Sequence, residues 1–342
     1  MMPALRRIAI LCVALGAHAS AAQGQGTVAD SAATQRYTLA VIGDTPYGPR
    51  KLEEFPRLIS LINVDTSVNV VVHLGDIKLG TNSPCTDEYN ATMRALFDSF
   101  TAPMVYTPGD NEWTDCHFDT KRNGLYMPTE RLQAVRKVFF PVPGQTLGGR
   151  KMQVLSQASD TANRAYVENV MWTAARVVFA TLNVPGSDDD AEPWGSEFPP
   201  NFEAFQAQPD ERAARGRANR TWVSKTFDMA TAQNAAGVVL MFQADMWDTT
   251  AALHGYDVLV RHIGTLAAAF KRPVLLLEGD SHVYRVDRPY ADSGFTTLHR
   301  GAPIAANVTR IVVEGANGRT EYLRVTVDPN GPTLFTYERV PL

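Results

Sequence analysis

The sequence predicts an α/β protein with a parallel or mixed β-sheet, and three observations support this class. Across roughly the first 140 residues, short runs of β-forming apolar residues alternate with segments of helical apolar spacing, an order typical of β-α-β units. Each of the first three predicted strands ends in a loop that contains Gly and Asp. After about residue 285, short strands separated by Gly, Asn and Pro turns predict an antiparallel closing sheet.

The individual elements are predicted in chain order from their local patterns. Strands are expected at 37–42, 68–74 and 104–106, alternating with helices at 56–64, 87–100 and 129–138. Apolar runs at 238–242 and 273–277 are typical of buried strands and enclose a helix expected at 249–270. The remaining segments predict a helix at 210–235 and six short strands, at 152–157, 164–170, 176–183, 308–314, 322–327 and 334–338.

Composition permits a packed core and argues against a nucleic-acid-binding surface. The chain has 342 residues, which suffices for one large domain or two small ones. Of these residues, 45% are hydrophobic and 20% are charged, a composition that permits a packed core. The formal net charge is −4 and no basic run stands out, so a dedicated nucleic-acid surface is not indicated. Because the sequence shows no internal repeat and no clear linker, we expect a single domain at 37–342.

The N-terminus has the pattern of a secretory signal peptide. Arg6 and Arg7 precede an apolar stretch at 8–15, and small residues follow it. This order predicts a cleaved signal peptide at 1–21, since the apolar stretch is shorter than the ~20 residues that span a bilayer. We therefore expect export to a periplasm or to the outside of the cell, with a flexible segment at 22–36.

Cys85 and Cys116 remain after removal of the predicted signal peptide. Two cysteines in an exported chain favour a disulfide bond, although two free thiols near loops are the alternative. A bridge between them would join the loop after the second strand to the loop after the third strand.

Oxygen-rich polar residues follow five of the predicted strands. Ligand sites in α/β sheets lie outside the carboxyl ends of the strands, so Asp44, Asp76 and Asp110 are expected to converge. A single Gly-Asp pair is common in turns, but five polar strand ends in succession predict a cluster of carboxylates. A bound divalent cation would remove the repulsion within such a cluster.

The five loops resemble the sequence blocks of the calcineurin-like metallophosphoesterase family, which are Asp-x-His, Gly-Asp, Gly-Asn-His-Asp/Glu, a lone His and Gly-His-x-His. The corresponding blocks are Gly43-Asp44-Thr45-Pro46, His73-Leu74-Gly75-Asp76, Gly109-Asp110-Asn111-Glu112, Gln243 and Gly279-Asp280-Ser281-His282. The resemblance spans residues 37–290. It implies a four-layer α/β/β/α sandwich with two mixed sheets, and hydrolysis of a phosphate ester by metal-activated water.

The resemblance further implies two divalent metal ions that share one carboxylate. The two ligand sets have Asp76 in common, with Asp44 and His282 at one ion and Asp110, Gln243 and Asp280 at the other. It assigns catalytic roles to Asn111 and His282, although an amide at position 111 can only donate a hydrogen bond. Because Pro46, Gln243 and Asp280 stand where the family has histidines, the oxygen-rich ligands suit Mn, Mg, Ca or Fe better than Zn.

Several neighbouring residues have two interpretations. The candidates for substrate binding are Lys78, Trp113 and His117. The alternatives are a solvated lysine, a core tryptophan and a surface histidine. Asp245 is an alternative ligand to Gln243, and His73 is expected to be structural. The acidic run at 187–190 is interpreted as a solvated turn, since charge runs usually face solvent.

Together these features predict a secreted metal-dependent phosphoesterase that acts on a small-molecule phosphate ester. The first alternative is a non-catalytic metal- or phosphate-binding protein of the same fold, because the expected catalytic histidine is absent. The second is a phosphodiesterase or nuclease, which the near-neutral charge disfavours. No stable nucleic-acid partner and no membrane span are expected.

Overall fold

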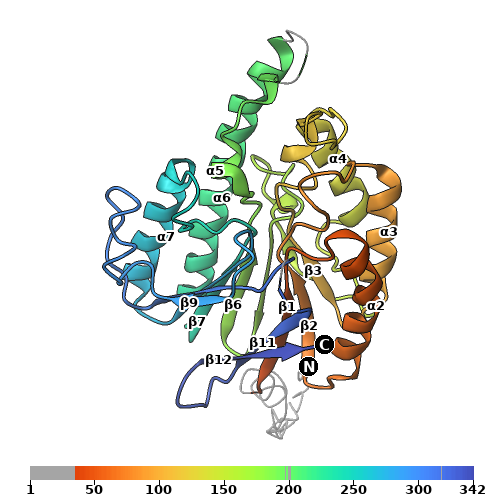
Figure 1. Ribbon diagram of the computed structural model, residues 1–342. Helices are drawn as coiled ribbons and strands as arrows, with labels where there is room; N and C mark the ends of the chain where they lie inside the picture. The colour runs from red at the N-terminus through yellow and green to blue at the C-terminus, as the bar shows by residue number, and fades with distance from the viewer. Residues whose placement is uncertain (1–34, 197, 199–201, 317) are drawn as a thin grey trace, which may run out of the picture.

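Two mixed β-sheets pack face to face at the centre of the molecule (Figure 1). The computed structural model describes residues 35–196, 198, 202–316 and 318–342. The predicted signal peptide at 1–21, and the predicted flexible segment up to residue 34, lie outside these residues. In the described part of the chain, no helix combines the length and the apolar character needed to cross a bilayer.

The first sheet has five strands in the order β12-β11-β1-β2-β3. Its members are β1 (Tyr37–Ile42), β2 (Val68–His73), β3 (Met104–Tyr106), β11 (Glu321–Val327) and β12 (Phe335–Pro341). Strands β1, β2 and β3 run parallel, whereas β11 pairs antiparallel with β1 and with β12. The C-terminal strands therefore close this sheet along the β1 edge.

The second sheet has seven strands in the order β4-β5-β6-β7-β8-β10-β9. Its members are β4 (Leu155–Ser156), β5 (Val170–Ala174), β6 (Val177–Thr181), β7 (Gly237–Met241), β8 (Val274–Glu278), β9 (Arg285–Asp287) and β10 (Val308–Val312). Strands β6, β7, β8 and β10 are parallel, and antiparallel strands flank them on both sides.

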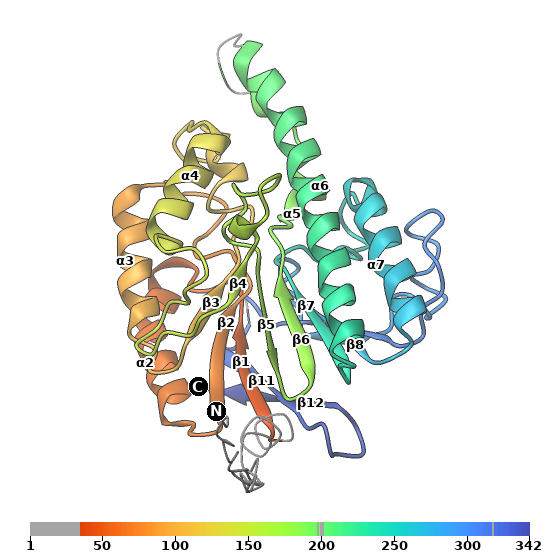
Figure 2. The same ribbon diagram turned by 180° about the vertical axis from the view of Figure 1, so that it is seen from behind.

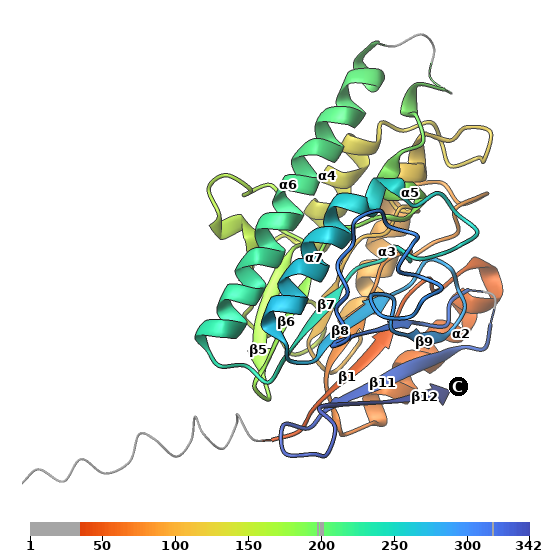
Figure 3. The ribbon, with the colours of Figure 1, turned by 90° about the vertical axis from the view of Figure 1, so that its left-hand side faces the viewer.

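Helices cover the outer face of each sheet, so the fold is the expected four-layer α/β/β/α sandwich. The first sheet is covered by α2 (Gly48–Val64), α3 (Asp87–Asp98) and α4 (Pro128–Phe139), and the second by α6 (Phe202–Ala232) and α7 (Asp257–Phe270). Figure 2 shows α6 crossing the second sheet and extending beyond the sandwich at one end. In Figure 3, α6 and α7 lie side by side over the same face. Five short helices lie in loops, namely η1 (Thr114–His117), η2 (Gln157–Ser159), α5 (Gly186–Asp190), η3 (Trp194–Ser196) and η4 (His254–Tyr256).

Three hydrophobic layers hold these elements together. The central layer lies between the sheets and includes Val72 from β2 and Leu277 from β8, both fully buried. A second layer packs α2, α3 and α4 onto the first sheet, and a third packs α6 and α7 onto the second sheet. Because central strands such as β7 are buried on both faces, their sequences are continuous apolar runs rather than alternating ones.

Several element predictions differ from the structure. Helix α2 begins at Gly48 and α6 at Phe202, each eight residues before the predicted start. A proline lies inside each helix, Pro56 in α2 and Pro209 in α6, and neither ends its helix. Pro56 lies on the solvent face of α2, where its side chain is exposed. The strand predicted at 164–170 is wrong, since β5 begins only at Val170. The closing segment is not a single antiparallel sheet, because β10 is parallel to β8.

Candidate metal centre

The site lies where the carboxyl ends of strands from both sheets meet. Loops after β1, β2 and β8 carry Asp44, Asp76, Asp280 and His282, and each of these residues has a positive φ between 50° and 70°. Such conformations cost non-glycine residues on the order of 1–3 kcal/mol each and concentrate at functional sites. The folded chain therefore maintains an unfavourable backbone at four neighbouring positions in order to direct these side chains.

Asp44, Asp76 and His282 form a group that could hold one metal ion. Ligand atoms of the three residues all lie within 4.8 Å of one another. His282 Nε2 lies 3.3 Å from Asp44 Oδ1, and its side chain is 24% exposed while Asp44 is fully buried. Two carboxylate oxygens and one imidazole nitrogen are suitable ligands for a divalent cation. The site is thus buried on the aspartate side and open to solvent at His282.

The charges in this group favour a bound cation. Burial, followed by the nearby charge of Asp110, raises the pKa of Asp76 and of Asp280 well above their ordinary values. Burial likewise raises the pKa of Asp44. Burial lowers the pKa of His282, but the hydrogen bond and charge of Asp44 outweigh it, so the net shift is upward. These shifts mean that the carboxylates need a positive partner when they are ionised.

The second predicted group is also assembled, but Gln243 does not present its oxygen to it. The side-chain nitrogen of Gln243 donates to Asp76 Oδ2 (3.2 Å) and to Asp110 Oδ1 (3.3 Å). Its oxygen Oε1 instead accepts the backbone N–H of Gly186 at 2.5 Å. The backbone N–H of Asp280 donates to Asp44 at 3.0 and 3.1 Å, so the Asp280 backbone contacts the first group.

Asn111 lies in the centre together with Tyr47, a residue that the sequence analysis missed. Asn111 Nδ2 donates to Asp76 Oδ2 and to the Tyr47 hydroxyl, each at 2.7 Å. The Tyr47 hydroxyl donates to the same Asp76 oxygen at 2.7 Å, and its ring contacts His282 edge-on. The available signal was its position three residues after Asp44, in the same loop.

Comparison with known proteins identifies the region that carries most of these loops. Residues 37–200 match the family model described as calcineurin-like phosphoesterase. The chain carries a calcineurin-like phosphoesterase domain. The matched residues include Asp44, Asp76 and Asp110, while Gln243 and His282 follow further along the phosphoesterase fold, after β7 and β8.

Solved structures similar to this chain at low sequence identity were also found. One is described as GAP50, the anchor in the inner membrane complex of Plasmodium, with 9% identity, a TM-score of 0.44, and coverage of 90% of this chain and 89% of that chain. Another is TT1561 of Thermus thermophilus, with 12% identity, a TM-score of 0.42, and coverage of 89% and 99%. No curated protein matches the sequence.

Behind the candidate metal centre, Glu112 and His73 position its loops. Glu112 Oε1 accepts the Tyr106 hydroxyl at 2.5 Å and the backbone N–H groups of Gly109 and Asp76 at 3.0 and 3.1 Å. His73 Nε2 donates to the Thr45 carbonyl at 2.7 Å. Its Nδ1 accepts from Gly75 N at 3.2 Å, which assigns the tautomer. His73 is therefore structural, as expected.

The three predicted substrate-binding residues do not line an open site. Lys78 is buried, and its Nζ donates to the Leu79 carbonyl at 2.9 Å. Burial lowers the pKa of Lys78 to about 8. Trp113 is fully buried against Leu132, so its core interpretation replaces the pocket interpretation. His117 is buried rather than on the surface, with Nδ1 2.6 Å from the Thr114 carbonyl oxygen.

The acidic run at 187–190 is not a solvated turn, which corrects the prediction. Its four residues have positive φ and form a left-handed turn packed against the site. Ser187 Oγ donates to Asp110 Oδ2 at 2.8 Å, and Asp189 pairs with the fully buried Arg215. Buried partners rather than water therefore satisfy most of this run.

Asp245 is not available as an alternative ligand. Its Oδ1 pairs with the buried Arg310, and its Oδ2 accepts from Ser281 Oγ at 2.8 Å. Its backbone N–H donates to Asp280 at 3.3 Å. Asp245 thus holds the loop that carries Asp280 and His282.

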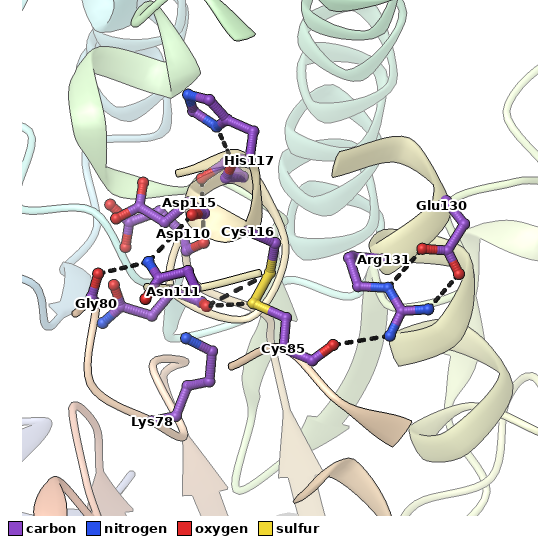
Figure 4. The surroundings of a disulfide bond; sticks show 12 residues. Lys78, Gly80, Cys85, Asp110, Asn111, Asp115, Cys116, His117, Glu130 and Arg131 are labelled. Carbon is purple, nitrogen blue, oxygen red and sulfur yellow. Dashed lines mark hydrogen bonds and ion pairs between the residues drawn. A yellow bond between two sulfur atoms is a disulfide. The ribbon is translucent and has the colours of Figure 1, made fainter. Parts of the chain in front are cut away.

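The predicted disulfide between Cys85 and Cys116 is present, with a Cα–Cα distance of 5.8 Å. Its sulfur atoms lie 3.6 and 3.8 Å from the Asn111 carbonyl oxygen. Figure 4 shows the disulfide between Asn111 and Arg131, whose Nη1 donates to the Cys85 carbonyl at 2.8 Å. The bridge therefore fixes the backbone beside the metal centre.

Proposed function

We propose that the chain is an exported, metal-dependent phosphoesterase that hydrolyses a small-molecule phosphate ester. The observation that carries this proposal is the convergence of Asp44, Asp76 and His282 within 4.8 Å in a calcineurin-like phosphoesterase domain. The disulfide supports export, since such bonds persist in oxidising compartments. The proposed cofactor is a divalent cation, with Mn, Mg, Ca or Fe favoured over Zn.

In this proposal, each residue of the centre has a distinct role. Asp44, Asp76 and His282 hold the cation, which when bound would act as a Lewis acid toward water and a phosphoryl oxygen. Tyr47 and Asn111 orient Asp76 through hydrogen bonds to one of its oxygens. The partly exposed His282 faces solvent, where the phosphate ester would enter.

Asn111 limits which leaving groups the site can release. A carboxamide cannot transfer a proton, so Asn111 cannot protonate the departing oxygen. Esters of acidic phenols need no such proton, whereas esters of simple alcohols do. We therefore propose that aryl phosphates are cleaved faster than alkyl phosphates, which makes a chromogenic aryl ester the appropriate probe.

The test is the hydrolysis of a chromogenic aryl phosphomonoester and the corresponding diester by Mn²⁺-loaded protein. We expect turnover in the wild type and its loss in Asp76→Asn. The matched control is Asp228→Asn, which makes the same change at an exposed position of α6 and should retain activity.

Metal-loaded protein that binds Mn²⁺ but cleaves neither ester would contradict the proposal and favour the non-catalytic alternative. The ratio of the two rates separates a phosphomonoesterase from a phosphodiesterase.

A further inference from the structure

We propose that the Gln243 amide takes the place of a second metal ion, so that the chain binds one divalent cation, at Asp44, Asp76 and His282. The inference concerns the metal centre of the proposed function and deepens it. It depends on metal binding but not on turnover. Three features of the described site support it.

The first feature is the orientation of the Gln243 amide. The backbone N–H of Gly186 can only donate, so the atom that faces it at 2.5 Å must be the carboxamide oxygen. The nitrogen then necessarily faces Asp76 and Asp110. Rotation of the amide would place its N–H₂ group against the Gly186 N–H and its oxygen against two carboxylates. Because Gln243 is fully buried, water could not compensate for those contacts.

The second feature is that donors from the chain already bind the carboxylates of the second position. Asp110 accepts one hydrogen bond at each oxygen, from Gln243 at Oδ1 and from Ser187 at Oδ2. Asp76 Oδ2 accepts three, from Tyr47, Asn111 and Gln243. These N–H and O–H donors place partial positive charge next to the carboxylates, where a second metal ion would otherwise place its charge. A bridging role for Asp76 would have to break them.

The third feature is the close approach of the left-handed turn at 187–190. A Cβ atom added to Gly186, the residue before that turn, would lie 2.7 Å from both Asp110 Oδ2 and Asp280 Oδ1. The backbone of Gly186 therefore packs directly against both carboxylates. The turn that follows Gly186 also supplies the Ser187 hydroxyl, which donates to Asp110. One segment therefore occupies the space of the second metal position and provides a hydrogen-bond donor to its carboxylates.

The first position differs in its ligand types and in its access to solvent. His282 offers an imidazole and is partly exposed, so an ion can reach it from solvent. The ligand atoms of Asp44, Asp76 and His282 are already within one coordination sphere of one another. Asp76 Oδ1 accepts one hydrogen bond, from the Asn111 backbone N–H at 3.2 Å, and its second lone pair remains for this ion.

The test is the metal stoichiometry of the full chain. Protein stripped with a chelator is titrated calorimetrically with Mn²⁺, and its metal content is measured after gel filtration. We expect one ion per chain in the wild type and two in Gln243→Glu, which keeps the side-chain shape but exchanges the donor for a ligand oxygen. Gln206→Glu, the same change at an exposed position of α6, should remain at one ion.

Two ions in the wild type would overturn the inference, and so would a Gln243→Glu variant that still binds one. If that variant fails to fold, Gln243→His supplies an imidazole at the same position and is expected to bind two ions. Asp110→Asn should still bind one ion, while Asp44→Asn should bind none. Turnover with two bound ions contradicts only this inference, whereas one bound ion without turnover contradicts only the phosphoesterase proposal.

Discussion

At the scale of single residues, the metal centre depends on buried side chains that do not belong to the proposed ligand set. His73 joins two site loops by hydrogen bonding to Thr45 and Gly75. Glu112 does the same for the loops after β2 and β3. Since four residues of the centre hold a positive φ, loss of such a support would relax the strained loops toward commoner conformations.

His73 provides a prediction for the pH dependence of stability. Burial lowers its pKa from 6.5 to about 4, so the unfolded chain binds this proton more tightly than the folded chain. Stability from this group is complete above pH 6.5 and is lost as the pH falls toward 4, by up to about 3 kcal/mol. Urea unfolding of His73→Gln should therefore show a shallower fall in the free energy of unfolding between pH 6.5 and 4. An unchanged pH slope would contradict the prediction.

At the scale of elements, loops rather than helices or strands carry the site, and cross-links hold these loops in place. The disulfide connects the loop after β2 to the 3₁₀ helix η1, across 31 residues of sequence. A hydrogen bond from Ser187, in the left-handed turn at 187–190, attaches a third loop to Asp110. The strands determine where these loops begin, and the cross-links determine the final positions of the loop side chains.

Removal of the disulfide should destabilise the fold. For a loop of this length, the chain-entropy account predicts a loss of about 4 kcal/mol in the double variant Cys85→Ser/Cys116→Ser. Denaturant unfolding measures this loss, and the reduced wild type serves as the control with the same covalent connectivity. A double variant as stable as the oxidised wild type would contradict the prediction, because the disulfide would then contribute nothing to the free energy of unfolding.

At the scale of the whole molecule, the centre exists only because the two sheets meet. Asp44 and Asp76 follow strands of the first sheet, while Gln243 and His282 follow strands of the second. A buried ion pair also joins the two halves, since Arg136 on α4 binds Glu168 just before β5 at 2.6 and 2.9 Å. Site geometry and inter-sheet packing are therefore coupled.

The Arg136–Glu168 pair provides a prediction for the stability of the contact between the two halves. Arg136→Ala leaves the Glu168 carboxylate buried without its cation, so we expect a loss of about 3–5 kcal/mol in the free energy of unfolding. Arg136→Ala/Glu168→Gln removes the uncompensated charge and should recover part of that loss. Thermal and denaturant unfolding of the two variants measure the difference, and equal losses in both would contradict the electrostatic account.

The sequence by itself determined the α/β class, most strand positions and the order of the polar loops. Continuous apolar runs mark strands buried on both faces, and this information is local. The strands at 37–42 and 104–106 were predicted with the bounds that the structure shows. The pairing of Cys85 with Cys116 was also predictable, because these are the two cysteines outside the predicted signal peptide.

Only the tertiary structure decided how the site residues are used. Trp113, Lys78 and His117 are adjacent to the site loops in sequence, but packing directs them into the interior. Gln243 was expected to be a ligand, yet the Gly186 N–H, 57 residues away along the chain, orients its amide the other way. Side-chain orientation depends on partners that are distant in sequence, and local patterns carry no information about such partners.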